Sequence, residues 1–159
     1  MTIQNKTILY TGAAGGLGLP STLAFLAAGA TVVAIDNDPA KGELLRAAAA
    51  EAGHDRLIFR ALDLSDLAGL KTALEAISAE VGGFDVVINN AAIYPSKPFE
   101  EYTIEEHQAV QRINVDAGIV CVQVALPSMR AKGFGRIINI ASVTLSGGWA
   151  NLSPYIQSK

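Results

Sequence analysis

"TGAAGGLGLP", residues 11–20, stands between a short β-branched run and an Ala- and Leu-rich stretch. Glycine suits a tight turn, a close approach of the backbone to a ligand, and close packing of a helix on a strand. Gly12, Gly16 and Gly18 can fill these roles. The N-terminus of the helix that follows would present free N–H groups to an anion. The stretch therefore predicts a strand, a glycine turn and a helix that can bind phosphate.

Neither of two common phosphate-binding patterns is met by this turn. The G-x-G-x-x-G pattern fails because Ser21 stands where the third glycine would be, and the P-loop fails because no Lys-Ser/Thr pair follows Leu17. The glycines therefore fit either a nucleotide site or a turn that only permits close packing.

Short β-branched runs alternate with longer stretches at helical period along the whole chain. The predicted strands are 6–11, 31–36, 56–61, 84–90 and 135–142, and the predicted helices are 18–28, 39–52, 65–81 and 103–131. Several runs are apolar without strict alternation, which is typical of strands buried on both faces. The pattern predicts a doubly wound, Rossmann-like α/β fold. It has a five-stranded parallel sheet, helices on both faces, and one domain over residues 1–159.

Two helix starts carry recognisable signals. Thr103 and Glu106 fit a capping box at the start of the longest helix. Pro39 stands early in the second helix, where its missing N–H costs nothing.

Composition narrows the class of protein. Net charge is −3, the sequence pI is about 5.3 and no basic face stands out, so no nucleic-acid partner is expected. The one cysteine, Cys121, suits a reducing compartment, and His54 and His107 suggest no metal site. The apolar stretches fall short of the roughly 18–20 residues of a membrane span. We expect a cytoplasmic protein with no membrane partner and no metal.

Asp36 ends the second predicted strand, eighteen residues after Gly18. A carboxylate there can accept hydrogen bonds from both hydroxyls of an adenosine ribose and would repel a 2′-phosphate. Asn37 and Asp38 follow, and no Arg or Lys is taken to be near in sequence, so the sequence favours NAD over NADP. Asp36 also fits a turn or helix-capping residue before Pro39.

Motifs along the whole chain resemble those of the short-chain dehydrogenase/reductase family. They are Thr11–Gly18, Asp63–Leu64, Asn89–Asn90–Ala91–Ala92, Asn114, Ser142, and Tyr155 with Lys159. The spacing of thirteen between Ser142 and Tyr155 also fits the family. Leu17 and Ala92 replace the more usual Ile and Gly, which are mild departures.

The resemblance implies an oxidoreductase that transfers a hydride between NAD(H) and an alcohol or carbonyl substrate. It implies cofactor-binding residues at Gly12, Gly16, Leu17, Gly18, Asp36, Asp63, Leu64, Asn90, Tyr155 and Lys159. It implies a catalytic set of Asn114, Ser142, Tyr155 and Lys159.

The chemistry of these side chains suits that reaction. A free tyrosine, with a pKa of about 10, is a poor base at neutral pH, and a nearby ammonium favours its phenolate form. Lys159, four residues after Tyr155, is expected on the same helix face. The hydroxyl of Ser142 can donate to the substrate oxygen. The family resemblance implies that Asn114 holds a water molecule that takes part in a proton relay. Taken singly, each also fits a plain role: a strand end for Ser142, a helix-surface amide for Asn114, and a solvated pair for Tyr155 and Lys159.

Two other functions stay open: a non-catalytic NAD-binding module for regulation or assembly, and an inactive fragment of the dehydrogenase. The family's fold continues beyond the Tyr155 helix, so its C-terminal part is expected to be absent from this chain. The resemblance implies a homo-oligomer, a dimer or tetramer, for the full-length protein; the apolar run 117–126 permits this, and core packing explains the run equally well. A partly apolar substrate would lie against a wall of Tyr94, Pro95, Leu145 and Trp149.

Overall fold

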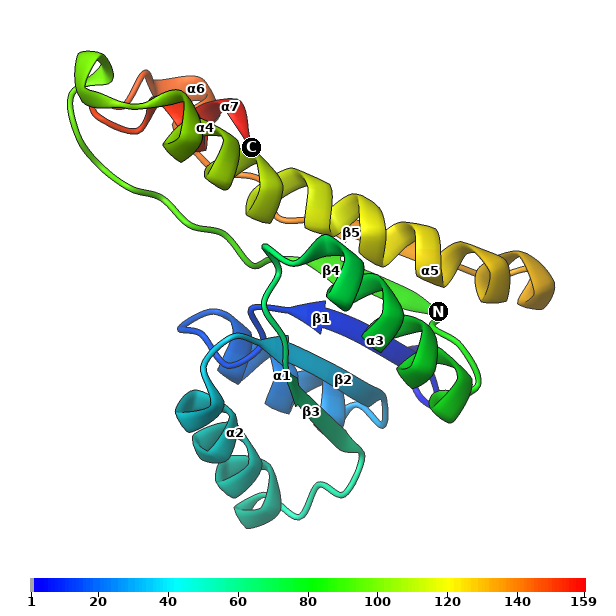
Figure 1. Ribbon diagram of the computed structural model, residues 1–159. Helices are drawn as coiled ribbons and strands as arrows, with labels where there is room; N and C mark the ends of the chain where they lie inside the picture. The colour runs from blue at the N-terminus through cyan, green and yellow to red at the C-terminus, as the bar shows by residue number, and fades with distance from the viewer. Residues whose placement is uncertain (1) are drawn as a thin grey trace.

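The chain forms a five-stranded parallel sheet in the order β3-β2-β1-β4-β5 (Figure 1). The computed structural model describes residues 2–159. The strands are β1 Thr7–Thr11, β2 Thr31–Asp36, β3 Leu57–Ala61, β4 Val86–Asn89 and β5 Arg136–Asn139. β1 pairs with β2 on one side and with β4 on the other. The strand order therefore runs outward from β1 in one direction for β2 and β3, and in the opposite direction for β4 and β5. A crevice therefore opens at the carboxyl ends of β1 and β4.

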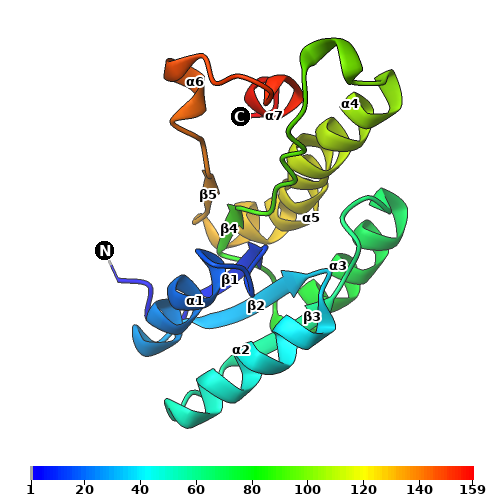
Figure 2. The ribbon, with the colours of Figure 1, turned by 90° about the vertical axis from the view of Figure 1, so that its left-hand side faces the viewer.

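Helices cover both faces of this sheet, with α1 and α2 on one side and α3 and α5 on the other (Figure 2). Their bounds are α1 Gly18–Ala27, α2 Pro39–Glu51, α3 Leu67–Val81, α4 Ile104–Gln111, α5 Ala117–Lys132, α6 Thr144–Gly147 and α7 Ser153–Gln157, with a 3-10 turn, η1, at Phe99–Glu101. The predicted doubly wound, Rossmann-like fold is confirmed.

Alternate residues of each central strand enter separate cores. Leu9 of β1 packs with Leu74 of α3 and Cys121 of α5 on one face. Its neighbour Ile8 packs with Leu45 of α2 on the other face. Both faces are apolar because both are covered, which explains why the sequence shows no strict alternation.

The predicted helix starts are largely correct. Thr103 Oγ1 accepts a hydrogen bond from the Glu106 N–H at 3.2 Å, and Glu106 Oε2 accepts one from the Thr103 N–H at 2.9 Å, which completes the capping box. Asp38 caps α2 ahead of Pro39. The third helix begins at Leu67 rather than residue 65, because Asp66 caps it.

The long helix predicted at 103–131 is interrupted by a π-helical turn, η2, at Arg112–Asp116. Such turns insert one residue into the helical ladder and are frequent at functional sites. The whole helix, Ile104–Lys132, is also long and apolar enough to cross a membrane by length and composition. The prediction that no stretch reaches that length is therefore wrong, although helices packed in a protein core meet the same criterion. Here Cys121 and Val124 pack into the core beside the sheet.

The last two strands are shorter than predicted. β4 begins at Val86 rather than residue 84, and β5 ends at Asn139 rather than residue 142. The Ile140 N–H still bonds to the Asn89 carbonyl at 3.0 Å, after which the chain leaves the sheet for α6. Ser142 therefore lies three residues past the strand that was predicted to end with it. All four residues of β5 are exposed, so this edge of the sheet is open in the structure.

Candidate active site

A cleft of about 610 Å³ lies at the carboxyl ends of the strands. It is lined by the turn after β1, the end of β2, the loops after β3 and β4, and the last residues of the chain. All ten residues that the sequence assigns to the cofactor contribute to its walls: Gly12, Gly16, Leu17, Gly18, Asp36, Asp63, Leu64, Asn90, Tyr155 and Lys159. Segments separated by up to 147 positions therefore meet at one site.

The glycines of the turn differ in how much room the structure leaves for a side chain. Gly12 has a φ of +66°, and a Cβ there would lie 2.9 Å from the Ala91 Cα. A Cβ at Gly18 would overlap the carbonyl oxygen of Gly12. Gly16 has no atom within 4 Å of its Cβ position, so a side chain there would be free of the protein. Packing thus requires glycine at positions 12 and 18, whereas at position 16 only space for a ligand would require it.

The N-terminus of α1 faces this cleft without a side-chain cap. Leu17 occupies the capping position and forms no side-chain hydrogen bond to the first turn. Helices usually satisfy their first N–H groups with a capping side chain, water or a ligand. With Gly16, Leu17 and Gly18 lining the cleft, this turn has the form of an anion site.

The glycine turn is held in place by hydrogen bonds with the loop that follows β4. Asn90 Nδ2 donates to the Thr11 and Gly12 carbonyl oxygens at 3.1 and 3.2 Å. The hydroxyl oxygen of Thr11 accepts from the backbone N–H groups of Asn90 and Ala91 at 3.1 and 3.2 Å. Both amide protons of Asn90 are used, so only its side-chain oxygen is left for a ligand. The sequence suggested no such role for the Thr11 hydroxyl, although a Thr directly before the glycine turn was a usable signal.

Asp36 is the last residue of β2 and lines the cleft there. Its carboxylate accepts hydrogen bonds from the Ala14 N–H at 3.1 Å and the Asp38 N–H at 3.3 Å. Lys41 lines the same cleft and lies 3.6 Å from the Asp38 carboxylate. The expectation of no Lys nearby is therefore wrong, because the first turn of α2 brings Lys41 back toward the end of β2.

Asp63 and Leu64 follow β3 along the same side of the cleft. Asp63 Oδ1 accepts from the Ser65 N–H at 2.8 Å, and this backbone hydrogen bond lowers the pKa of Asp63. Leu64 is buried in the core beneath. A fixed, ionised Asp63 can offer a hydrogen-bond acceptor to a flat ring of a bound ligand, and the apolar Leu64 beside it can contact the face of that ring.

Tyr155 and Lys159 lie together in the wall of the cleft. Lys159 Nζ lies 5.6 Å from the centroid of the Tyr155 ring and donates to the Ile140 carbonyl at 2.9 Å. Burial lowers the pKa of Lys159. The two residues do not share one regular helix as predicted, because α7 ends at Gln157 and the Lys159 N–H bonds three residues back to Ile156. The side chains nonetheless meet.

Ser142 lies in the loop between β5 and α6, next to Ala141 of the cleft wall. Its hydroxyl oxygen accepts from the Thr144 N–H at 3.2 Å and from the Thr144 hydroxyl at 2.9 Å. Among residues 2–159, no hydrogen bond joins Ser142 to Tyr155 or Lys159. The hydroxyl proton of Ser142 is thus not committed to either of them.

Asn114 lies in the π turn, and its side chain joins three segments. Its Oδ1 accepts from the Ile93 N–H at 2.8 Å, and its Nδ2 donates to the Ile93 carbonyl at 3.0 Å and the Ser158 hydroxyl at 2.8 Å. Asn114 is therefore not a free helix-surface amide. It connects the long helix to the loop after β4 and to the residue before Lys159.

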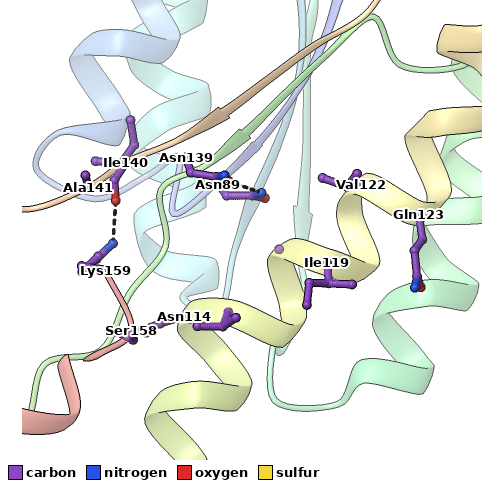
Figure 3. Close-up of a pocket in the computed structure, with 12 residues that line it drawn as sticks. Asn89, Asn114, Ile119, Val122, Gln123, Asn139, Ile140, Ala141, Ser158 and Lys159 are labelled. Carbon is purple, nitrogen blue, oxygen red and sulfur yellow. Dashed lines mark hydrogen bonds between the residues drawn. The ribbon is translucent and has the colours of Figure 1, made fainter. Parts of the chain in front are cut away.

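A second cavity, of about 370 Å³, adjoins Asn114 and Lys159 on the side of α5 (Figure 3). At its floor Asn89 Nδ2 donates to Asn139 Oδ1 at 2.9 Å, which joins the ends of β4 and β5. Asn89 Oδ1 is buried and has no hydrogen-bond partner within the described part of the chain. The cavity therefore combines a polar floor with the apolar side chains of Ile119 and Val122 on α5.

Other reactive groups lie outside these cavities. Burial raises the pKa of Cys121 to about 12, so its thiol stays protonated at neutral pH. Within residues 2–159 no three His, Cys, Asp or Glu side chains gather in a way that could hold a metal ion.

Known proteins are similar to this chain in sequence and in fold. The chain is 37% identical to galactitol 2-dehydrogenase of Agrobacterium fabrum, over all of this chain and 61% of that protein. A gluconate 5-dehydrogenase structure from Burkholderia cenocepacia, in complex with NADP and tartrate, is 28% identical with a TM-score of 0.88, covering 99% of this chain and 62% of that one. A xylitol dehydrogenase structure with bound NAD+ has a TM-score of 0.90 at 24% identity, over 100% and 61% of the two chains.

The match to a known family is nearly continuous. The chain spans about three fifths of the length of these relatives. Residues 6–159 match the family described as short chain dehydrogenase. The chain therefore belongs to the short chain dehydrogenase family.

Proposed function

We propose that this chain forms the cofactor-binding and catalytic part of an oxidoreductase that transfers a hydride between NAD(H) and an alcohol or carbonyl compound. One observation carries the proposal: a single cleft joins Asp36 and the uncapped start of α1 to Tyr155 and Lys159. A bound nicotinamide dinucleotide supplies the hydride acceptor or donor. The protein supplies binding, orientation and proton transfer.

The residues of the cleft fit a dinucleotide along its length. The backbone N–H groups of Gly16, Leu17 and Gly18, at the start of α1, would meet the pyrophosphate, and the open space at Gly16 leaves room for it. Within the first turn, the Leu19 and Ser21 N–H groups already bond to the Gly15 and Leu17 carbonyls. Asp36 would accept from the adenosine ribose, and Asp63 with Leu64 would meet the adenine. Asn90 would keep the glycine turn in shape.

We propose NAD rather than NADP as the preferred cofactor. The carboxylate of Asp36 would repel a 2′-phosphate, because the two anions would share one end of the cleft. Lys41 could offset this repulsion, but it pairs with Asp38 at 3.6 Å. Since one relative of known structure binds NADP and another binds NAD+, the preference rests on Asp36 alone.

Tyr155 is proposed as the group that takes the proton from the substrate hydroxyl in the oxidative direction. The ammonium of Lys159 lies 5.6 Å from the centroid of the Tyr155 ring, where its positive charge would stabilise negative charge on the substrate oxygen and the phenol as the proton moves. Ser142 would donate its uncommitted hydroxyl proton to the substrate oxygen. Asn114 would fix the segment around Ser158 and Lys159, and the polar cavity beside it has room for water that could carry the proton onward.

The substrate is proposed to be a secondary alcohol or the matching ketone that is partly apolar. Three large apolar side chains are exposed near Tyr155 in the fold: Tyr94 in the loop after β4, Leu145 in α6, and Trp149 just after α6. We also propose that the protein is cytoplasmic and forms a dimer or tetramer, with the exposed Ile119 of α5 available for a subunit contact.

The test is an assay of the intact protein with NAD+, NADP+ and a panel of secondary alcohols. Tyr155→Phe removes only the phenolic oxygen and should lower kcat by about 10²–10⁴-fold, the range for loss of a general base. Tyr10→Phe makes the same chemical change at a tyrosine buried in the sheet and should leave kcat unchanged. Equal turnover in wild type and Tyr155→Phe would refute the role of Tyr155.

A calorimetric titration separates the alternatives. Micromolar binding of NAD+ with no turnover on any alcohol or carbonyl compound would point to a non-catalytic dinucleotide-binding module. Binding without preference between NAD+ and NADP+ would contradict the role given to Asp36.

A further inference from the structure

Tyr94 contacts the proposed proton-transfer residue directly. It lies in the loop after β4 and lines the same cleft as Tyr155. The two rings meet edge to face, with centroids 5.9 Å apart and an interplanar angle of 65°. This is the arrangement that aromatic pairs prefer. Lys159 approaches the same Tyr155 ring, so two neighbours restrict the motion of that ring.

The backbone before Tyr94 is fixed by Asn114. Both the N–H and the carbonyl of Ile93 bond to the side chain of Asn114, at 2.8 and 3.0 Å. The position of the Tyr94 Cα is therefore set by the π turn of the long helix. The same amide holds Ser158, so one side chain aligns the segments that carry Tyr94 and Tyr155.

The chain after Tyr94 is tied to the segment that leads into α7. The Lys97 N–H donates to the Asn151 carbonyl at 3.0 Å, and the hydroxyl of Tyr102 lies 2.6 Å from the Pro95 carbonyl and 2.9 Å from that of Asn151. Asn151 has a left-handed φ of 64°, which directs its carbonyl into this cluster. The loop of Tyr94 and the start of α7 are thus joined on both sides of the ring contact.

We propose that Tyr94 is a positioning residue that holds the Tyr155 ring in the orientation needed for proton transfer. The side chain of Tyr94 is 68% exposed, so the residue is not retained for core packing. Its one ring partner among residues 2–159 is Tyr155. A fixed backbone and a single aromatic contact at the mouth of the cleft are what such a role requires. The inference rests on the proposed function of Tyr155.

The experiment compares Tyr94→Ala, Tyr94→Phe and Phe99→Ala in the intact protein. Loss of an aromatic pair should lower kcat of Tyr94→Ala by about 2- to 12-fold, with the Kd for NAD+ unchanged and the pH profile of kcat displaced. Tyr94→Phe keeps the ring contact with Tyr155 and should recover most of the kcat that Tyr94→Ala loses. Phe99 is as exposed, at 71%, but lies outside the cleft, so Phe99→Ala should change nothing.

A second measurement does not depend on turnover. NMR signals of labelled tyrosine rings identify Tyr155 by their loss in Tyr155→Phe, and Tyr94→Ala should shift these signals and increase ring flipping. Unchanged Tyr155 signals in Tyr94→Ala would overturn the inference, as would equal impairment of kcat in Tyr94→Phe and Tyr94→Ala. If Tyr155→Phe retains full activity, the proposed function fails instead, and the ring signals still decide the role of Tyr94.

Discussion

Gly18→Ala adds one methyl group where the structure has no room for it. The new Cβ would overlap the carbonyl oxygen of Gly12 and lie 2.6 Å from the Ala13 carbonyl carbon and 2.8 Å from its Cα. All three are backbone atoms, so no side-chain rotation can relieve the clash. The glycine turn itself has to move.

The expected loss of stability follows from what the Gly12 carbonyl does. It accepts hydrogen bonds from the Gly15 N–H at 3.3 Å and from Asn90 Nδ2 at 3.2 Å. Overpacking costs about 1–3 kcal/mol, and each weakened hydrogen bond about 0.5–1.5 kcal/mol. The better helix propensity of alanine returns up to about 1 kcal/mol. A net loss of about 3 kcal/mol should lower Tm by about 6–12 °C in a chain of this size.

Gly16→Ala is the matched control, since it adds the same methyl group in the same turn. No atom lies within 4 Å of its Cβ position, so Tm should change by no more than about 2 °C. The methyl group enters the cleft, so the affinity for NAD+ should still fall. Thermal unfolding by circular dichroism and calorimetric titration measure the two effects in the intact protein. If Gly18→Ala melts at the temperature of Gly16→Ala, the packing argument is wrong.

Three further predictions concern other parts of the chain. Asp85→Ala removes the buried acceptor of the Thr7 N–H, at 2.9 Å, and of Lys132 Nζ, at 3.0 Å, and should cost about 2–4 kcal/mol in urea unfolding; a loss under about 1 kcal/mol would contradict it. Cys121, whose pKa burial raises to about 12, should react with iodoacetamide at pH 8 only after unfolding, and native labelling at the unfolded rate would count against that burial. Because burial lowers the pKa of Lys159, the unfolded state binds more protons at this group between that lowered pKa and the usual value of about 10.4, so Lys159 contributes a free energy of unfolding that rises with pH in this window, while Cys121, whose pKa is raised, contributes one that falls. Lys159→Met should remove only the rising contribution, so the slope of its unfolding free energy against pH should lie below the wild-type slope, and equal slopes would contradict the contribution of Lys159.

The sheet was predictable because its signals are local. Residues 31–36 form β2 with the predicted bounds, since the apolar run 32–35 is followed by a polar turn that begins at Asp36. The strand at 135–142 was overestimated because its end depends on a partner. The ladder stops where the Asn89 carbonyl accepts its last bond, and no local residue pattern marks that point.

The site was predictable as a set of residues, but not as a set of contacts. The π turn at 112–116 has no signature in the helical period, yet it aims Asn114 at both Ile93 and Ser158. Lys41 was missed because sequence distance from Asp36 was taken for spatial distance. The Tyr94 ring contact likewise depends on two loops that meet only in the folded chain.

The glycine turn is closed by a residue 78 positions further along the chain, because Asn90 supplies a bond to the Gly12 carbonyl. The entropy of closing a loop of that length is roughly 4 kcal/mol. The Gly15 N–H bonds to the same carbonyl from within the turn, but only Asn90 joins the Thr11 and Gly12 carbonyls to each other. During synthesis on the ribosome, the turn therefore cannot take its final shape until β4 has emerged. Cofactor capture by the nascent chain should begin only after residue 90 is free, even though the glycines were made first.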